Sequence, residues 1–251
     1  MTTPVTIGKA KLKVLDLFSG IGGFSLGLER TGGFETVAFC EIDPKAAKTL
    51  SVNFPGVPIY DDVRAISASR LQSDGIAVDI ICGGFPCQDI SAAGARAGLD
   101  GERSGLWFEM ARIIGELRPQ FVIVENVAEL LDNGFGDVLG SLAAIRYNAE
   151  WDCIPASALG APHPRDRVWI IAYPQEVTGL HESDAWKAAK RLLDHPTYWQ
   201  ANPWDETHPA ICRVDDGFPD RVDRTEQLGN SVIPQIPELI GRAILQSMEA
   251  A

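Results

Sequence analysis

The sequence predicts an α/β protein in which a mostly parallel β-sheet is flanked by helices. Three observations support this fold class: apolar runs of strand length recur along the chain, segments with helical apolar spacing separate them, and glycine-rich turns join the two. Strands that alternate with helices are typical of a parallel sheet. The chain of 251 residues is long enough for one sizeable domain with a small appendage.

The expected elements follow one another in a regular order. The apolar run 12–19 predicts a first strand that ends at the glycines of "GIGG", and the helix expected at 24–32 ends at Gly32 and Gly33, which suit a helix C-cap. The elements expected next are a strand at 35–43, a helix at 44–54 with Pro44 in its first turn, a third strand end at 59–63, a strand at 77–85, a helix at 104–119, a strand at 120–127, a helix at 135–147 and a strand at 165–173.

The composition changes after Pro174. Little strand pattern follows, and one helix is expected at 183–194. Helical periodicity returns near the C-terminus. We therefore expect a main domain at 10–174, a small variable region at 175–225, and a C-terminal segment at 226–251 that packs back on the main domain.

Composition and charge limit the possible functions. No signal pattern opens the chain and no apolar run reaches membrane-spanning length, so we expect a cytoplasmic protein without membrane contact. The five cysteines form no C-x-x-C pair and no zinc spacing, so we expect no metal site. Four of them are expected in the core: Cys40, Cys82, Cys153 and Cys212. The net charge of −12 argues against broad electrostatic binding of nucleic acid, although a local basic groove remains compatible with it.

The loop "DLFSGIGG" lies where the first strand meets the first helix, which is where α/β sheets bind nucleotides. It lacks the G-x-G-x-x-G form, so it suits close approach by a ligand without phosphates. Glu41 ends the second strand, the usual place for a carboxylate on ribose hydroxyls, and Asp62 could accept from an adenine amino group. These features fit S-adenosylmethionine better than NAD, while three unrelated turns are the structural alternative.

Reactive side chains lie at the predicted ends of three further strands. Cys87 follows the fourth strand, Glu125 and Asn126 end the fifth, and Arg165 and Arg167 open the last. Taken singly, the cysteine is more often a small buried residue, the glutamate a cap and the arginines a solvated pair. Because all of these residues lie at predicted strand ends, we expect them at one edge of the sheet, and this common position favours a nucleophile, an acid and two cations beside the cofactor loop.

Seven motifs in linear order resemble the DNA cytosine-5 methyltransferase family, in its small phage or bacterial form. They are "DLFSGIGGFSLGLE", "EID", "DDV", "GGFPCQDIS", "ENV", "GAPHPRDRVWI" and "LGNSVIP". The resemblance runs from about residue 12 to 173 and again from about 227 to 240. It implies a Rossmann-like S-adenosylmethionine-dependent methyltransferase fold, with 175–225 as a short target-recognition region.

The resemblance also implies a mechanism. Cys87 would add to C6 of a cytosine flipped out of duplex DNA, and Glu125 would hold and protonate N3. Asn126 would orient Glu125 and the backbone, while Arg165 and Arg167 would steady the cysteine loop and the base. Restriction-modification and phage systems are the settings that this resemblance suggests.

The same resemblance identifies residues for the cofactor and for DNA. The cofactor residues it implies are Asp16, Phe18, Ser19, Gly20, Gly22, Gly23, Glu41, Ile42, Asp62, Val63, Gly84, Pro86, Asn230 and Val232. The stretch 88–104 resembles the mobile loop that closes over the flipped base. Its candidate DNA contacts are Gln88, Ser91, Arg96 and Arg103.

The chain departs from the family pattern in two places. His163 stands where glutamine is common, and the region 175–225 is short and carries more acidic than basic residues. We therefore keep two alternatives: methylation of cytosine in RNA such as tRNA, and an adenosylmethionine- and DNA-binding module without turnover. A nicotinamide-linked oxidoreductase fits less well because the glycine loop has the wrong form. We expect a monomer, because such enzymes act on one base at a time.

Overall fold

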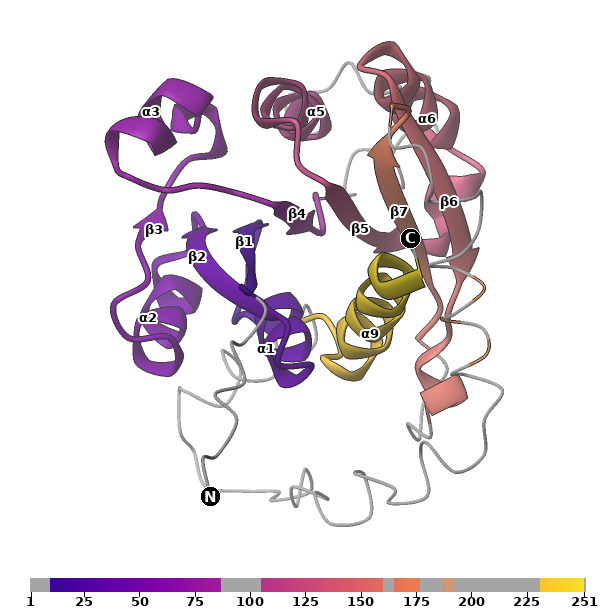
Figure 1. The fold of residues 1–251 in the computed structure, drawn as a ribbon, viewed down its shortest axis with the longest axis horizontal. Coiled ribbons are helices and arrows are strands. Elements are labelled where there is room, and N and C mark those ends of the chain that lie inside the picture. The colour runs from indigo at the N-terminus through magenta and orange to yellow at the C-terminus, as the bar shows by residue number, and fades with distance from the viewer. Residues whose placement is uncertain are drawn as a thin grey trace, which may run out of the picture.

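A computed structural model describes residues 10–86, 105–159, 165–176, 187, 189, 191 and 231–250. These residues form a sheet with the strand order β3-β2-β1-β4-β5-β7-β6 (Figure 1). The strands are β1 (Leu12–Leu17), β2 (Phe34–Cys40), β3 (Ile59–Tyr60), β4 (Ile80–Gly83), β5 (Phe121–Val127), β6 (Tyr147–Cys153) and β7 (Arg167–Pro174). The α-helices are α1 (Gly23–Arg30), α2 (Pro44–Asn53), α3 (Ala68–Ser73), α5 (Gly105–Leu117), α6 (Phe135–Ala144) and α9 (Gln235–Ala250).

Strand direction brings distant parts of the chain to one edge of the sheet. The strands β1 to β5 run parallel to one another, whereas β7 runs antiparallel to both β5 and β6. In the register, Val127 at the end of β5 lies opposite Arg167 at the start of β7. The beginning of β7 therefore lies at the edge where the parallel strands end.

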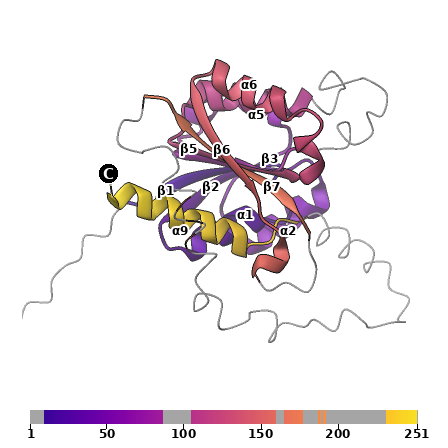
Figure 2. The ribbon, with the colours of Figure 1, turned by 90° about the vertical axis from the view of Figure 1, so that its right-hand side faces the viewer.

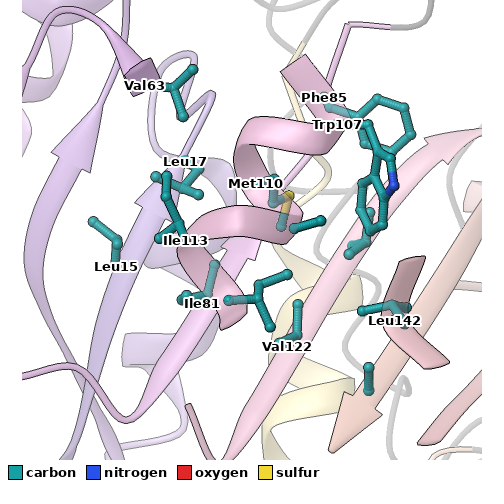
Figure 3. Close-up of a cluster of buried hydrophobic side chains, with 14 of the residues drawn as sticks. Leu15, Leu17, Val63, Ile81, Phe85, Trp107, Met110, Ile113, Val122 and Leu142 are labelled. Atoms are coloured by element: carbon teal, nitrogen blue, oxygen red, sulfur yellow. The ribbon is translucent and has the colours of Figure 1, made fainter. Parts of the chain in front are cut away.

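Helices cover both faces of the sheet. In Figure 2, α5 and α6 lie over one face, and α1 and α9 lie over the other. The core under α5 contains Trp107, which is fully buried and packs on Phe85 with the ring centroids 5.2 Å apart (Figure 3). On the other face, Phe24 of α1 packs edge-on against Trp169 of β7, with the ring centroids 5.6 Å apart. The hydrophobic cores on the two faces of the sheet therefore both include residues near strand ends, with Phe85 after β4 on one face and Trp169 in β7 on the other.

Glycines allow α9 and the chain before it to lie close to α1. A Cβ atom at Gly23 would overlap the carbonyl oxygen of Val232, and one at Gly27 would overlap the carbonyl oxygen of Pro234. Because both obstacles are backbone atoms, neither can move aside as a flexible side chain could. The close contact between α1 and the C-terminal segment therefore requires glycine at both positions.

We expect Gly27→Ala to lower the free energy of unfolding by about 1–3 kcal/mol, since the added methyl group overpacks a buried interface. The matched control is Gly140→Ala in α6, where a Cβ atom would meet nothing within 4 Å on an exposed helical face. That change should raise stability by up to about 1 kcal/mol, because alanine is the better helix former. Urea unfolding measures both changes, and equal effects would contradict the packing account.

The expected α/β fold class is confirmed, and most expected elements are present with slightly shorter bounds. The sequence pattern did not predict α3 or β6. In the described sheet the edge strand β6 pairs with β7 alone, and its residues Asn148, Glu150 and Asp152 are polar, so the segment contains no apolar run. Cys153 ends this strand and is exposed, so its expected place in the core is wrong, whereas Cys40 and Cys82 are buried. Cys212 lies outside the described residues.

Two further expectations can be compared with the structure: the strand end at 59–63 and the helix at 183–194. The strand β3 ends at Tyr60, two residues before Asp62. Lys187, Ala189 and Arg191 are helical, in agreement with the helix expected at 183–194. Among the described residues, no helix has both the length and the apolar character needed to cross a membrane.

Candidate active site

The candidate residues lie around one edge of the sheet. The glycine loop follows β1, Glu41 follows β2 and Gly84 follows β4. Glu125 and Asn126 are the last two residues of β5 before Val127. The chain then returns to this edge at Arg165 and Arg167, at the start of β7. The strand directions, rather than proximity in sequence, bring these groups together.

The glycine loop has an unusual backbone. Three of its residues adopt left-handed conformations: Phe18 with φ 55°, Gly20 with φ 54° and Gly22 with φ 88°. Such a conformation is strained for a side chain like that of Phe18 and is more frequent at functional sites. The Ser19 hydroxyl donates to the carbonyl oxygen of Asp16 at 2.6 Å, and the Gly22 N–H donates to that of Ser19 at 2.9 Å. These bonds hold the loop as a tight turn.

Glu41 links the loop to the end of β2. Its Oε2 accepts from the Gly20 N–H at 2.6 Å, and its Oε1 accepts from the Asp43 N–H at 2.8 Å. Burial raises its pKa, and the backbone hydrogen bonds act in the opposite direction. A carboxylate has about four acceptor positions, so Glu41 keeps capacity for a hydroxyl group of a ligand beside its bonds to the backbone.

The space beside the loop suits an adenosyl group. A Cβ atom at Gly20 would meet nothing within 4 Å, so the loop faces open space. Ile42 is 78% exposed and offers an apolar surface next to Glu41. The Asp62 side chain accepts from the Arg64 N–H at 2.9 Å at the start of η1 (Val63–Ala65), and Val63 is buried.

The donor set favours a ligand without phosphates. The loop "DLFSGIGG" contains no basic side chain, and the carboxylate of Glu41 occupies the Gly20 N–H that a phosphate would need. A carboxylate for ribose hydroxyls and an exposed apolar side chain for a base both fit an adenosyl ligand. The residues present therefore fit S-adenosylmethionine.

Asp16 lies beneath the loop and does not reach its surface. The side chain is fully buried, its Oδ2 accepts from the Ser25 hydroxyl at 2.7 Å, and the Cys82 thiol also bonds to it. Its Oδ1 has no hydrogen-bond partner within the described part of the chain. Burial raises the pKa of Asp16 from 3.8 to about 7, although the bonds from Ser25 and Cys82 lower it. Asp16 therefore supports the loop from below through α1, and its expected contact with the cofactor stays a prediction.

This buried acid predicts a specific dependence of stability on pH. The folded protein binds the Asp16 proton more tightly than the unfolded chain, so its contribution to stability is lost as pH rises from about 4 to about 7. The shift corresponds to at most roughly 4 kcal/mol. Asp16→Asn should therefore become more stable relative to the wild type across that window. Urea unfolding at a series of pH values measures the difference, and a constant difference would contradict the burial of an ionisable group.

Glu125 is the central acidic group of the site. Its side chain is 12% exposed, and its Oε1 lies 3.0 Å from Nε of Arg167. A Cβ atom at Gly84 would lie 2.9 Å from Oε2, so the glycine lets the β4 end approach the carboxyl group. Burial raises the pKa of Glu125, against the lowering effects of Arg167 and Arg165. The carboxyl group is therefore suited to hold a proton and to donate it to a bound base.

Asn126 fixes the backbone that leads to Cys87. Its amide Nδ2 donates to the carbonyl oxygen of Phe85 at 3.1 Å, and its Oδ1 accepts from the Val127 N–H at 2.9 Å. Phe85 is also held by its contact with Trp107. The chain is thereby anchored two residues before the expected nucleophile.

The two arginines have different partners. Arg167 forms the ion pair with Glu125, whereas Nη2 of Arg165 donates to the carbonyl oxygen of Ser231 at 2.7 Å. The sequence reading did not identify Ser231, and its only signal was its place after Asn230 in "LGNSVIP". Val232 lies next to it and contacts α1 at Gly23.

Several expected residues lie outside the described residues. They are Cys87, Gln88, Ser91, Arg96, Arg103, His163 and Asn230. Within the described ranges, no group of three or more His, Cys, Asp or Glu side chains could hold a metal ion.

Comparison with known proteins gives consistent matches. Residues 12–201 match the family model described as C-5 cytosine-specific DNA methylase. The Type II methyltransferase M2.BsuMI of Bacillus subtilis is 36% identical over 202 residues, which cover 75% of this chain and 50% of the relative. The orphan methyltransferase M.SPRI of Bacillus phage SPR is 29% identical over 248 residues, which cover 90% of this chain and 55% of the relative. The chain spans about half the length of these relatives.

Solved structures give the same picture. A prophage-encoded E. coli protein named as a DNA modification methyltransferase matches with a TM-score of 0.57 and 29% identity, covering 66% of this chain and 48% of that one. DNMT2 of Spodoptera frugiperda also matches with a TM-score of 0.57, over 95% of this chain and 98% of that one. At 16% identity, the second match shows the fold alone.

Proposed function

The chain belongs to the C-5 cytosine-specific DNA methylase family, and on that basis we propose that it transfers a methyl group from S-adenosylmethionine to C5 of cytosine in duplex DNA. The observation that carries the proposal is the place of Glu125. This buried acid lies against Gly84 and pairs with Arg167, at the sheet edge that also holds the glycine loop. An acid that can protonate a base ring beside an adenosyl site is what this reaction needs.

The chemistry explains why both an acid and a nucleophile are required. Cytosine C5 is a poor nucleophile until a group adds to C6. In the proposed reaction the Cys87 thiolate forms a bond to C6, the electrons of the C5–C6 double bond move into the ring, and N3 takes the proton of Glu125. C5 thereby becomes nucleophilic and can form the new bond to the methyl carbon. Loss of the C5 proton to solvent, with elimination of Cys87 and return of the N3 proton to Glu125, restores the ring and the enzyme.

The remaining residues position these groups. Asn126 holds the Phe85 carbonyl and so anchors the chain before Cys87, and Arg167 orients Glu125. Glu41 and Ile42 would hold the cofactor's ribose and adenine beside the glycine loop. When bound, S-adenosylmethionine supplies the electrophilic methyl group that the activated C5 accepts.

The substrate is proposed to be a base flipped out of the duplex, because C6 is not accessible to a side chain within stacked base pairs. Gln88, Ser91, Arg96 and Arg103 are proposed DNA contacts of the 88–104 loop. The named relatives are Type II and phage methyltransferases, which supports a bacterial or phage modification enzyme. We propose that it acts as a monomer, since one base is modified at a time.

Incubation with methyl-labelled S-adenosylmethionine tests the proposal, with duplex DNA of mixed sequence and tRNA as parallel substrates. We expect labelling of the duplex, and sequencing of the labelled cytosines then gives the target site. Labelling of tRNA alone would replace DNA with RNA as the substrate. If neither nucleic acid is labelled while the cofactor still binds, the chain is a binding module and the proposal is wrong.

A further inference from the structure

The two arginines that open β7 contact different parts of the molecule. Arg167 pairs with Glu125 at 3.0 Å, whereas Arg165 donates through Nη2 to the Ser231 carbonyl at 2.7 Å. The backbone of Arg165 has φ 34°, in the left-handed region that a side chain of this kind seldom adopts. Burial lowers the pKa of the Arg165 guanidinium, as does the neighbouring Arg167, while Glu125 raises it. This half-buried cation thus lies on an unusual backbone.

The partner of Arg165 leads directly to the cofactor loop. Ser231 precedes Val232, whose carbonyl oxygen occupies the space that a side chain on Gly23 would need. Gly23 is the first residue of α1 and follows Gly22, which has φ 88° in the loop. The backbone at 231–232 therefore lies between the arginine and the end of the glycine loop.

A second contact holds the same segment one helical turn further along. The carbonyl oxygen of Pro234 lies against Gly27 of α1, and α9 then continues along this helix. Phe24 in the same turn of α1 packs on Trp169, which is in the strand that Arg165 precedes. The first turn of α1 is enclosed between β7 and the 231–234 segment.

We propose that Arg165 is a positioning residue that holds the 231–234 segment against α1 and thereby sets the affinity of the glycine loop for the adenosyl cofactor, while Arg167 acts on Glu125. The proposal rests on the proposed function only for the identity of this ligand. It assigns the hydrogen bond of Arg165 to the cofactor half of the site and the ion pair of Arg167 to the half that contains Glu125. The proposal includes no contact between Arg165 and the base.

The test measures the binding of S-adenosylhomocysteine by calorimetry, without DNA. Arg165→Gln should weaken binding by about 10-fold or more, because the amide cannot reach the Ser231 carbonyl from the shorter side chain. Arg165→Lys should remain within about 3-fold of the wild type, since a single N–H donor is enough for one carbonyl. Arg167→Gln should bind the cofactor within about 2-fold of the wild type but lose methyl transfer.

A matched variant separates positioning from general loss of stability. Leu245→Ala removes a packing contact of α9 with Gly33, near the far end of α1, and should lower the melting temperature with little change in affinity. If Leu245→Ala weakens cofactor binding as much as Arg165→Gln, Arg165 is only structural. Unchanged affinity of Arg165→Gln would likewise overturn the proposal.

Hydrogen exchange in the ligand-free protein gives a readout that does not depend on the proposed function. Arg165→Gln should speed exchange of the loop amides from Gly20 to Gly23, and Arg167→Gln should leave it unchanged. This result is expected even if S-adenosylhomocysteine proves not to bind the wild type, which would instead contradict the proposed cofactor. Equal protection of the loop in both variants would contradict the link through Ser231.

Discussion

Replacing Cys87 with serine is expected to lower methyl transfer to duplex DNA by at least about 10³-fold, equivalent to about 4 kcal/mol of activation free energy. A thiol is a few per cent ionised near neutral pH and is a strong nucleophile, whereas a serine hydroxyl stays protonated without a dedicated base. Binding of S-adenosylhomocysteine should stay within about 2-fold, because the change exchanges one sulfur atom for oxygen in a residue that is not among the proposed cofactor contacts. Labelled methyl transfer and calorimetry measure the two effects.

Cys153 provides the matched control for this change. It is an exposed free thiol at the end of β6, and the mechanism does not use it. Cys153→Ser should therefore transfer methyl groups at the wild-type rate. Equal labelling by the wild type and Cys87→Ser would contradict the assignment of the nucleophile.

Replacing Glu125 with glutamine is expected to lower methyl transfer by about 10²–10⁴-fold, the usual contribution of a general acid. Glutamine keeps the shape of the side chain but has no proton to transfer to N3. It also leaves Arg167 without the carboxylate that pairs with it at 3.0 Å. Cofactor binding should persist, since the contacts of Glu41 with the loop are not altered.

The pH dependence gives a second readout for Glu125. Burial raises its pKa, so a larger fraction carries the required proton near neutral pH than for an exposed glutamate. The wild-type rate should fall as pH rises through that pKa, and the residual rate of Glu125→Gln should lack this fall. A variant within about 3-fold of the wild type, or one with the same pH profile, would contradict the role of general acid.

The sequence could predict the common edge of the site because strand direction follows from the alternation of strands and helices. Once β1, β4 and β5 are parallel, the ends of these strands must lie together, and Gly84 and Glu125 follow from that order. The antiparallel direction of β7 was not predicted. That direction brings Arg165 and Arg167, which lie at the start of the strand before "VWIIA", to the edge where β1, β4 and β5 end, so the sequence pattern alone did not determine their place there.

Other features depend on contacts that the linear pattern does not contain. Arg165 and Ser231 are 66 residues apart, and their bond depends on how the C-terminal segment packs against α1. The burial of Asp16 likewise follows from the closeness of β4 and α1, since Cys82 and Ser25 enclose it. From the sequence alone, an acid near a strand end is interpreted as a ligand contact, because the pattern does not show whether its side chain faces the ligand or the core.

A duplex that carries 5-fluorocytosine tests the central claim most directly, because fluorine blocks the elimination that frees the enzyme. With S-adenosylmethionine present, the wild type should form a denaturant-stable protein–DNA adduct, and mass spectrometry should place the bond on Cys87. The Cys87→Ser variant should form none. Methylation of ordinary duplex DNA without any adduct on the fluorinated duplex, or an adduct on another residue, would contradict the covalent mechanism.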